Sequence, residues 1–171
     1  MKRYINLLST CTFFLLLSLS AVAQSNTKNS VDSLGILKWL SKSFSFNKPD
    51  TGFVQLAEGN GYTNKNISAT IKYITFPSLY SKTKSEFLEE KSTETSLILN
   101  IEYHKVNNQE AVSIIKEEVS PDQSQYENFI TITTIMGFEN ISVCIIGAYP
   151  KSKDSILRKK YIEASLTLKE H

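Results

Sequence analysis

The sequence predicts an α+β domain with an antiparallel sheet of about six to seven strands flanked by helices. Three observations predict this class: segments of alternating apolar and polar residues, turn sequences between them, and two segments with helix signals. The chain has 171 residues, 41% hydrophobic and 21% charged, which is the composition of an ordinary folded protein. This length is typical of a single hydrophobic core.

The first 23 residues have the three parts of a secretory signal peptide. Lys2 and Arg3 come first, an apolar run covers residues 12–19, and small side chains at Ala21 and Ala23 precede an expected cleavage site after Ala23. We therefore expect export to the periplasm or the medium, with no stable membrane span after cleavage. The alternative is an uncleaved anchor, but the apolar run is too short to cross a bilayer as a helix.

Cleavage at this site would remove Lys2, Arg3 and Cys11. Lys plus Arg then falls from 19 to 17, which equals the 17 acidic residues, so the expected mature chain has no net charge. Nucleic-acid binding needs a basic surplus, so we do not expect that partner. Cys144 becomes the single cysteine, which excludes an intramolecular disulfide and leaves stability to the packed core.

The expected mature chain begins with a polar stretch, residues 24–30, which we interpret as a flexible leader ahead of one domain over residues 31–171. Apolar residues recur every third position over 31–40 and predict a short helix. Two strands with turn residues between them follow, at 52–57 and 66–76. Pro77 ends the second strand.

A helix over residues 84–91 is expected after Pro77. Thr83 and Glu86 have the spacing of a capping box, in which each side chain binds the backbone N–H of the other residue. A hairpin follows, with a tight turn at Asn107-Asn108, because asparagine tolerates the left-handed backbone that such a turn requires. Its strands are expected at 97–104 and 110–119. On the first of them one face carries Leu97, Leu99, Ile101 and Tyr103, and Tyr103 is expected opposite Val112 and Ile101 opposite Ile114.

A second hairpin is expected from strands over 129–136 and 141–149, joined by residues 137–140 with Met136 opposite Ile141. Residues 141–149 are apolar on both faces, so we expect a central strand covered by a helix on each side. Pro150 ends this strand, and Ser152 or Asp154 is the expected cap of a last helix. The apolar residues of that helix recur at helical spacing: Leu157, Tyr161, Ala164 and Leu168.

This order of elements resembles the Mog1/PsbP-like α+β family over residues 44–169. The sequence features that carry the resemblance are residues 147–150 leaving a central strand, the helix-to-tail ending over residues 156–168, and Asn47-Lys48-Pro49 ahead of residues 52–54. The resemblance implies an antiparallel sheet flanked by helices and a non-catalytic role, since members assist or bind protein complexes. It implies no catalytic residue and no cofactor.

His104 is the candidate for chemistry, because it shares a strand face with Glu102. A zinc site needs three or four protein ligands, so we favour an exposed polar pair with neither a metal nor a catalytic role. A small hydrolase that uses His104 as its base is an alternative, although the sequence has no G-x-S-x-G motif. Cys144 lies in an apolar strand, where we expect a buried and unreactive thiol.

Charged and aromatic residues give the remaining candidates. Acidic residues gather on the middle helix: Glu86, Glu89, Glu90 and Glu94. Basic residues gather near the last helix and form the candidate partner surface: Lys151, Lys153, Arg158, Lys159 and Lys160. Ordinary solvated helix faces are the alternative for both groups. A tyrosine-lined groove is the alternative to core packing for seven residues: Tyr62, Tyr73, Tyr80, Tyr103, Tyr126, Tyr149 and Tyr161.

The functional hypothesis is therefore an exported, non-enzymatic, protein-binding accessory domain of the cell envelope. A carrier of an apolar or aromatic small molecule is the second hypothesis, and it requires an enclosed cavity. The hydrolase that uses His104 is the third.

Overall fold

The structure is a computed structural model that describes residues 42–122 and 126–171. The expected signal peptide, the leader over residues 24–30, the helix over 31–40 and the expected start of the domain lie outside the described residues. No helix within them is long and apolar enough to cross a membrane.

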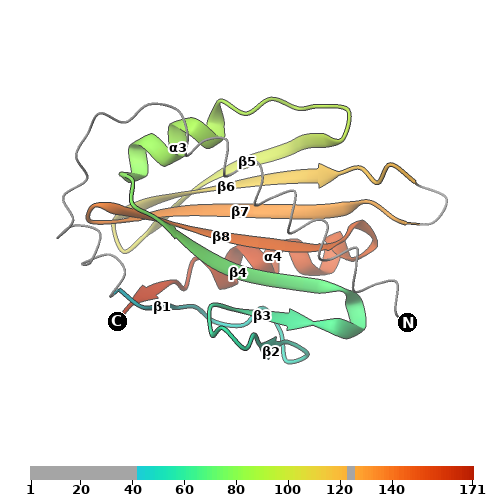
Figure 1. Ribbon diagram of the computed structural model, residues 1–171, viewed down its shortest axis with the longest axis horizontal. Coiled ribbons are helices and arrows are strands. Elements are labelled where there is room, and N and C mark those ends of the chain that lie inside the picture. The colour runs from blue at the N-terminus through green and yellow to red at the C-terminus, as the bar shows by residue number, and fades with distance from the viewer. Residues whose placement is uncertain (1–41, 123–125) are drawn as a thin grey trace. The chain divides into compact units, whose positions relative to one another are not determined.

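Within the described residues, seven strands form one antiparallel sheet in the order β2-β3-β4-β8-β7-β6-β5 (Figure 1). This confirms the predicted α+β class. The sheet strands are β2 (Val54–Gln55), β3 (Gly61–Asn64), β4 (Ala69–Phe76), β5 (Ser96–Val106), β6 (Gln109–Glu118), β7 (Phe129–Phe138) and β8 (Ile141–Pro150). The other elements are β1 (Phe44–Ser45), η1 (Lys65–Ile67), α3 (Tyr80–Leu88), η2 (Lys151–Lys153), α4 (Asp154–Ser165) and β9 (Lys169–Glu170).

Each face of the sheet carries its own hydrophobic core. On one face, Leu157 and Tyr161 of α4 pack against Ile145 and its neighbours. On the other face, side chains of α3 pack against a second cluster that includes Cys144. Strands β6, β7 and β8 contribute to both clusters, and the residues of β8 are almost all buried. The prediction of a central strand with a helix on each side is therefore confirmed.

The first hairpin has the expected register, with Tyr103 opposite Val112 and Ile101 opposite Ile114. Asn107 and Asn108 both have positive φ, 49° and 65°, as a two-residue turn of type I′ requires.

The four apolar residues expected on one face of β5 do not share a buried face. A bulge between Ile98 and Asn100 shifts the alternation, so Ile98 and Ile101 pack beneath α3 while Leu97 and Leu99 are exposed. The residues expected on a single face therefore separate at the bulge. Tyr103 lies on the same face as Ile101 but is exposed, because β5 is the outermost strand of the sheet.

The second hairpin has a shorter loop than expected. Phe138 pairs with Ile141, so the turn is Glu139-Asn140, and Met136 lies opposite Val143 rather than Ile141. Glu139 takes the left-handed backbone that closes this turn, with φ 51°. The register moves by two residues, which keeps every side chain on its expected face.

Two strand predictions were too long. Only Val54–Gln55 of the expected strand over 52–57 is a strand, and β4 begins at Ala69 rather than residue 66. The Asn64 side chain accepts a hydrogen bond from the Asn66 backbone N–H, which caps the short helix η1. Ser68 then has φ 52° and turns the chain into β4.

Both helix caps were also predicted wrongly. Helix α3 begins at Tyr80 instead of residue 84, and Thr83 is buried within it, so no capping box forms. Lys153 occupies the cap position of α4 and makes no side-chain cap hydrogen bond. The Asp154 carboxylate instead accepts hydrogen bonds from Tyr149 and Arg158.

The expected extended tail after α4 is present and closes the domain. Its strand β9 pairs with β1, and the His171 N–H donates to the Ser43 carbonyl over 3.0 Å. This pairing holds the buried Phe44 against Phe138, with ring centroids 5.0 Å apart.

Candidate protein-binding surface

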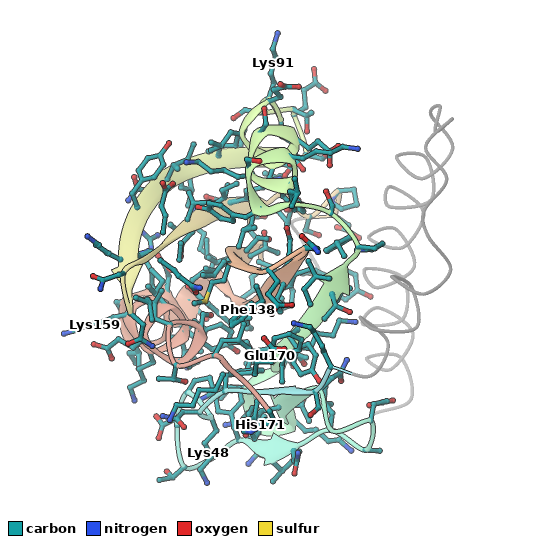
Figure 2. All side chains as sticks on the ribbon, turned by 90° about the vertical axis from the view of Figure 1, so that its left-hand side faces the viewer. Lys48, Lys91, Phe138, Lys159, Glu170 and His171 are labelled. Carbon is teal, nitrogen blue, oxygen red and sulfur yellow. The ribbon has the colours of Figure 1, made fainter. Side chains whose placement is uncertain are left out.

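Helix α4 has an outer side that faces solvent. Ile156 is 57% exposed there, although Leu157 beside it is buried. Lys153 precedes Ile156 by three residues, and Lys159 and Lys160 follow it by three and four, so helical geometry places all three on its side of the helix. Figure 2 shows Lys159 pointing away from α4. We call Lys153, Ile156, Lys159 and Lys160 the α4 surface.

The lysines of the α4 surface are only partly neutralised. Lys159 is paired with Glu163 over 3.7 Å, but its side chain is 85% exposed, so this ion pair is weak. Lys160 binds Asp50, and its ammonium group is the main reason that the pKa of that carboxyl lies below its ordinary value. Lys153 makes no ion pair within the described part of the chain. The α4 surface is therefore an exposed isoleucine bordered by lysines.

The other two residues of the predicted basic group bind carboxylates of their own chain. The Lys151 ammonium lies 2.7 and 2.8 Å from the two carboxylate oxygens of Glu117, which is buried on β6. Asn128 donates to the same carboxylate over 2.5 Å. The Lys151 hydrogen bond, followed by that of Asn128, lowers the pKa of Glu117. Lys151 therefore compensates a buried charge.

Arg158 is bound to Asp154 one turn earlier on α4. Its Nε donates to Asp154 Oδ1 over 3.0 Å, and the buried Tyr149 hydroxyl donates to the same oxygen over 2.9 Å. The Asp154 hydrogen bond is the largest reason that the pKa of Arg158 is raised. The structure thus places three of the five predicted basic residues on the α4 surface and two on internal carboxylates.

Ile156 was not predicted as a site residue, although the sequence contains a signal for its exposure. At about 100° per residue, Ile156 lies about 140° around the helix from Tyr161, whose side chain was expected in the core. Helix α3 ends at Leu88, so of the four acidic residues expected on the middle helix only Glu86 lies on it. Glu86 lies 4.0 Å from Lys82, and Glu90, which follows the helix, pairs with Lys116. They do not form a matching acidic counterpart of the α4 surface.

His104 belongs to a line of polar groups across three strands. The His104 Nε2 atom lies 3.1 Å from Ser113 Oγ and 4.0 Å from a carboxylate oxygen of Glu102. Ser113 Oγ in turn lies 2.8 Å from Thr134 Oγ1. Ser113 and Thr134 are fully buried, and His104 itself is half-buried rather than fully exposed. The serine that touches the histidine is therefore closed to any substrate. No group of three or more metal-ligating side chains lies within the described ranges.

Cys144 and most of the tyrosines with defined contacts serve the core. Cys144 is fully buried, and burial raises the pKa of its thiol. Tyr149 and Tyr161 are also fully buried and pack edge to face, with centroids 4.8 Å apart. Tyr103 is the exception, at 62% exposed.

A shallow depression of about 410 Å³ lies beside η2. Four of its five lining residues are polar or charged, and Lys151 and Asn128 among them already bind Glu117. It lacks the enclosed apolar lining that an apolar ligand needs. The lining residues are Tyr126, Glu127, Asn128, Lys151 and Ser152.

Two solved structures are similar to this fold. LpqN of Mycobacterium tuberculosis, described as involved in cell envelope biogenesis, has a TM-score of 0.56 at 8% identity, covering 76% of this chain and 84% of that chain. The fold is Mog1/PsbP-like. The cyanobacterial PsbP protein CyanoP of Synechocystis sp. PCC 6803 has a TM-score of 0.49 at 7% identity, covering 75% and 93%. No family model and no curated protein matches the sequence, so the Mog1/PsbP-like assignment is one of fold.

Proposed function

We propose that this chain is an exported, non-enzymatic accessory domain that binds an acidic protein partner in the cell envelope through its α4 surface. The observation that carries the proposal is Ile156, an exposed apolar side chain with lysines at the helical positions around it. An apolar contact surrounded by charges of one sign is the composition of a docking site for a partner of opposite charge.

The location is supported by the N-terminal signal features and by the fold. Lys2 and Arg3, the apolar run over residues 12–19 and Ala23 match a cleavable signal. LpqN shows that a protein of this fold takes part in envelope biogenesis. Fold alone does not determine function, so the partner has to be found by experiment.

The two alternatives have weaker support. A hydrolase with His104 as its base would need an accessible nucleophile, but the hydroxyl beside His104 belongs to the fully buried Ser113. A carrier would need an apolar cavity, and the depression beside η2 is shallow and mostly polar.

The test is site-specific photo-crosslinking in the native cells. A photoreactive amino acid replaces Ile156 in one strain and Val54 in another, since Val54 is equally exposed, at 60%, on the edge strand β2. We expect an acidic protein to be captured from position 156 and not from position 54. Equal capture from both positions, or none from position 156, contradicts the proposal.

Charge reversal gives the second part of the test. The double variant Lys153→Glu, Lys159→Glu should abolish the capture, while Lys48→Glu, an exposed lysine elsewhere on the domain, should leave it unchanged. N-terminal sequencing of the exported chain should begin at Gln24. A small molecule that co-purifies without any protein partner would favour the carrier.

A further inference from the structure

The long free edge of the sheet is strand β5. It runs for 11 residues, whereas β2 at the opposite edge has only two. A short edge strand offers little backbone for pairing, but a long one is a template for another strand. Leu97, Leu99 and Tyr103 on β5 are three of the six large exposed hydrophobic residues in the described part of the chain.

The hairpin turn determines which backbone groups of β5 face outward. In a two-residue turn the flanking residues, Val106 and Gln109, exchange both backbone hydrogen bonds, and the pairing to β6 then alternates along the strand. His104 and Glu102 therefore bond to β6. The N–H and C=O groups of Ile101, Tyr103 and Lys105 point away from the sheet.

The first half of this edge is blocked by side chains. Ser92 Oγ accepts a hydrogen bond from the Ile98 N–H over 3.0 Å, and Asn100 Oδ1 accepts one from the Ile101 N–H over 2.9 Å. The block at Ile101 comes from the neighbouring side chain, which a rotation removes. Within the described part of the chain, no side chain accepts a hydrogen bond from the N–H of Tyr103 or Lys105. The edge is thus open near the turn.

We propose that a second copy of this chain pairs with β5, so that two sheets join antiparallel about a twofold axis at Tyr103. In this register the outward groups match completely: Tyr103 lies opposite the partner's Tyr103, and Ile101 lies opposite the partner's Lys105. Each of these pairs exchanges two backbone hydrogen bonds. The two Tyr103 side chains meet on one face of the joined sheet.

Side-chain pairing favours this register over its neighbours. Centring on Tyr103 puts Glu102 opposite the partner's His104 at a non-hydrogen-bonded position, where side chains approach most closely. A register centred on Glu102 would oppose two carboxylates, and one centred on His104 would oppose two imidazoles. A register centred on Ile101 would bring the blocked Ile98 and the bulge into the interface.

The interface uses a different part of the molecule from the α4 surface, and the two tests are independent. Sedimentation of the purified chain should show a reversible dimer. Tyr103→Lys should give a monomer, because two like charges then face each other on the axis. Val54→Lys is the matched control on the other edge and should leave the dimer intact. Unchanged thermal denaturation of both variants would show that they fold, as expected for exposed positions.

Cysteine cross-linking tests the register. In a Cys11→Ser background, Tyr103→Cys should form an intermolecular disulfide readily, because Cα atoms at a hydrogen-bonded antiparallel pair lie about 5.5 Å apart. Lys105→Cys should not, since the two copies of that position are four residues apart in register, about 13 Å.

A monomer at every concentration up to about 1 mM, the weak end of specific binding, overturns the proposal. So does a dimer that Tyr103→Lys leaves intact, or one in which Lys105→Cys cross-links as well as Tyr103→Cys.

Discussion

Gly147 of β8 lies in close contact with α4. A Cβ added there would lie 2.2 Å from Cδ1 and 2.5 Å from Cε1 of Tyr161, whose ring is fully buried. Tyr161 in turn packs against Phe53 and Tyr149, so the ring has no free direction in which to move. The absence of a side chain at Gly147 is thus a packing requirement of β8.

We expect Gly147→Ala to lower the free energy of unfolding by about 2 to 3 kcal/mol, which is the usual cost of overpacking a core. Ser155→Ala is the control, because this residue is exposed on α4 and the substitution there should change stability by less than about 0.5 kcal/mol. Urea denaturation of both variants measures the difference. Equal losses would mean that Tyr161 moves aside freely.

The thiol of Cys144 is shielded by both neighbouring strands and by the core beneath α3. Because burial also raises its pKa, little thiolate forms at neutral pH. Labelling of the folded protein with a thiol reagent should therefore proceed only through unfolding and should accelerate on adding denaturant. Labelling that is equally fast with and without denaturant would contradict the burial of this side chain.

Strand β6 carries a buried carboxylate that depends on an element outside the sheet. Glu117 is bound by Lys151 of η2, and this hydrogen bond keeps its pKa below the ordinary value of 4.5. The unfolded chain therefore binds a proton at this residue more readily than the folded chain. The stability contributed by Glu117 is fully present above pH 4.5 and is lost as the pH falls through the lower, folded pKa.

Glu117→Gln should cost about 1 to 3 kcal/mol at pH 7, because Lys151 and Asn128 lose a charged acceptor. It should also make the stability fall less steeply below pH 4.5 than in the parent protein. Glu94→Gln removes an exposed carboxylate and serves as the control. Urea titrations at several pH values give both quantities. Parallel pH dependences for parent and Glu117→Gln would contradict the role assigned to Glu117.

Element types followed from the sequence because they depend on periodicity, and element ends did not because they depend on local contacts. The second hairpin kept its predicted faces although its register moved by two residues, since a shift by an even number preserves the alternation. The capping box failed because Thr83 lies on the apolar side of α3 and is buried there. The sequence alone does not distinguish a capping residue from a buried helix residue, because it does not show which side of the helix packs against the sheet.

The candidate site was predicted in part, for a similar reason. The sequence identified the basic residues around α4, but it did not show that Lys151 turns to the buried Glu117 of β6, 34 residues earlier. Ile156 was overlooked although the helix phase set by Tyr161 places it away from the core. The exposure of Tyr103 follows from the edge position of β5, which alternation alone does not predict.

At the scale of the whole described domain, its first and last segments complete one core. Phe44 is buried, and its ring packs against Tyr73 and Phe138 at centroid distances of 5.9 and 5.0 Å. Lys42 binds Glu139 and Glu170, and these contacts raise its pKa. The pairing of β1 with β9 is therefore integral to the packing although each strand has only two residues.

We expect Phe44→Ala to lower the free energy of unfolding by about 3 to 5 kcal/mol, the usual cost of deleting a buried phenylalanine. Lys48→Ala, four residues later and exposed, should change it by less than about 0.5 kcal/mol. Calorimetry of both variants measures the effect. A Phe44→Ala protein as stable as its parent would show that the first strand is dispensable.

The pairing of β1 with β9 also sets a time for biogenesis. The pair joins Ser45 to Lys169, so 124 residues separate the two strands along the chain (169 − 45). At about 5 to 20 residues per second, synthesis of that interval takes about 6 to 25 s. Throughout it the nascent chain presents Phe44 without its strand partner, so the domain is finished only after translation has passed β9. A chain that is still incomplete in this way exposes Phe44 to chaperones while it is being made.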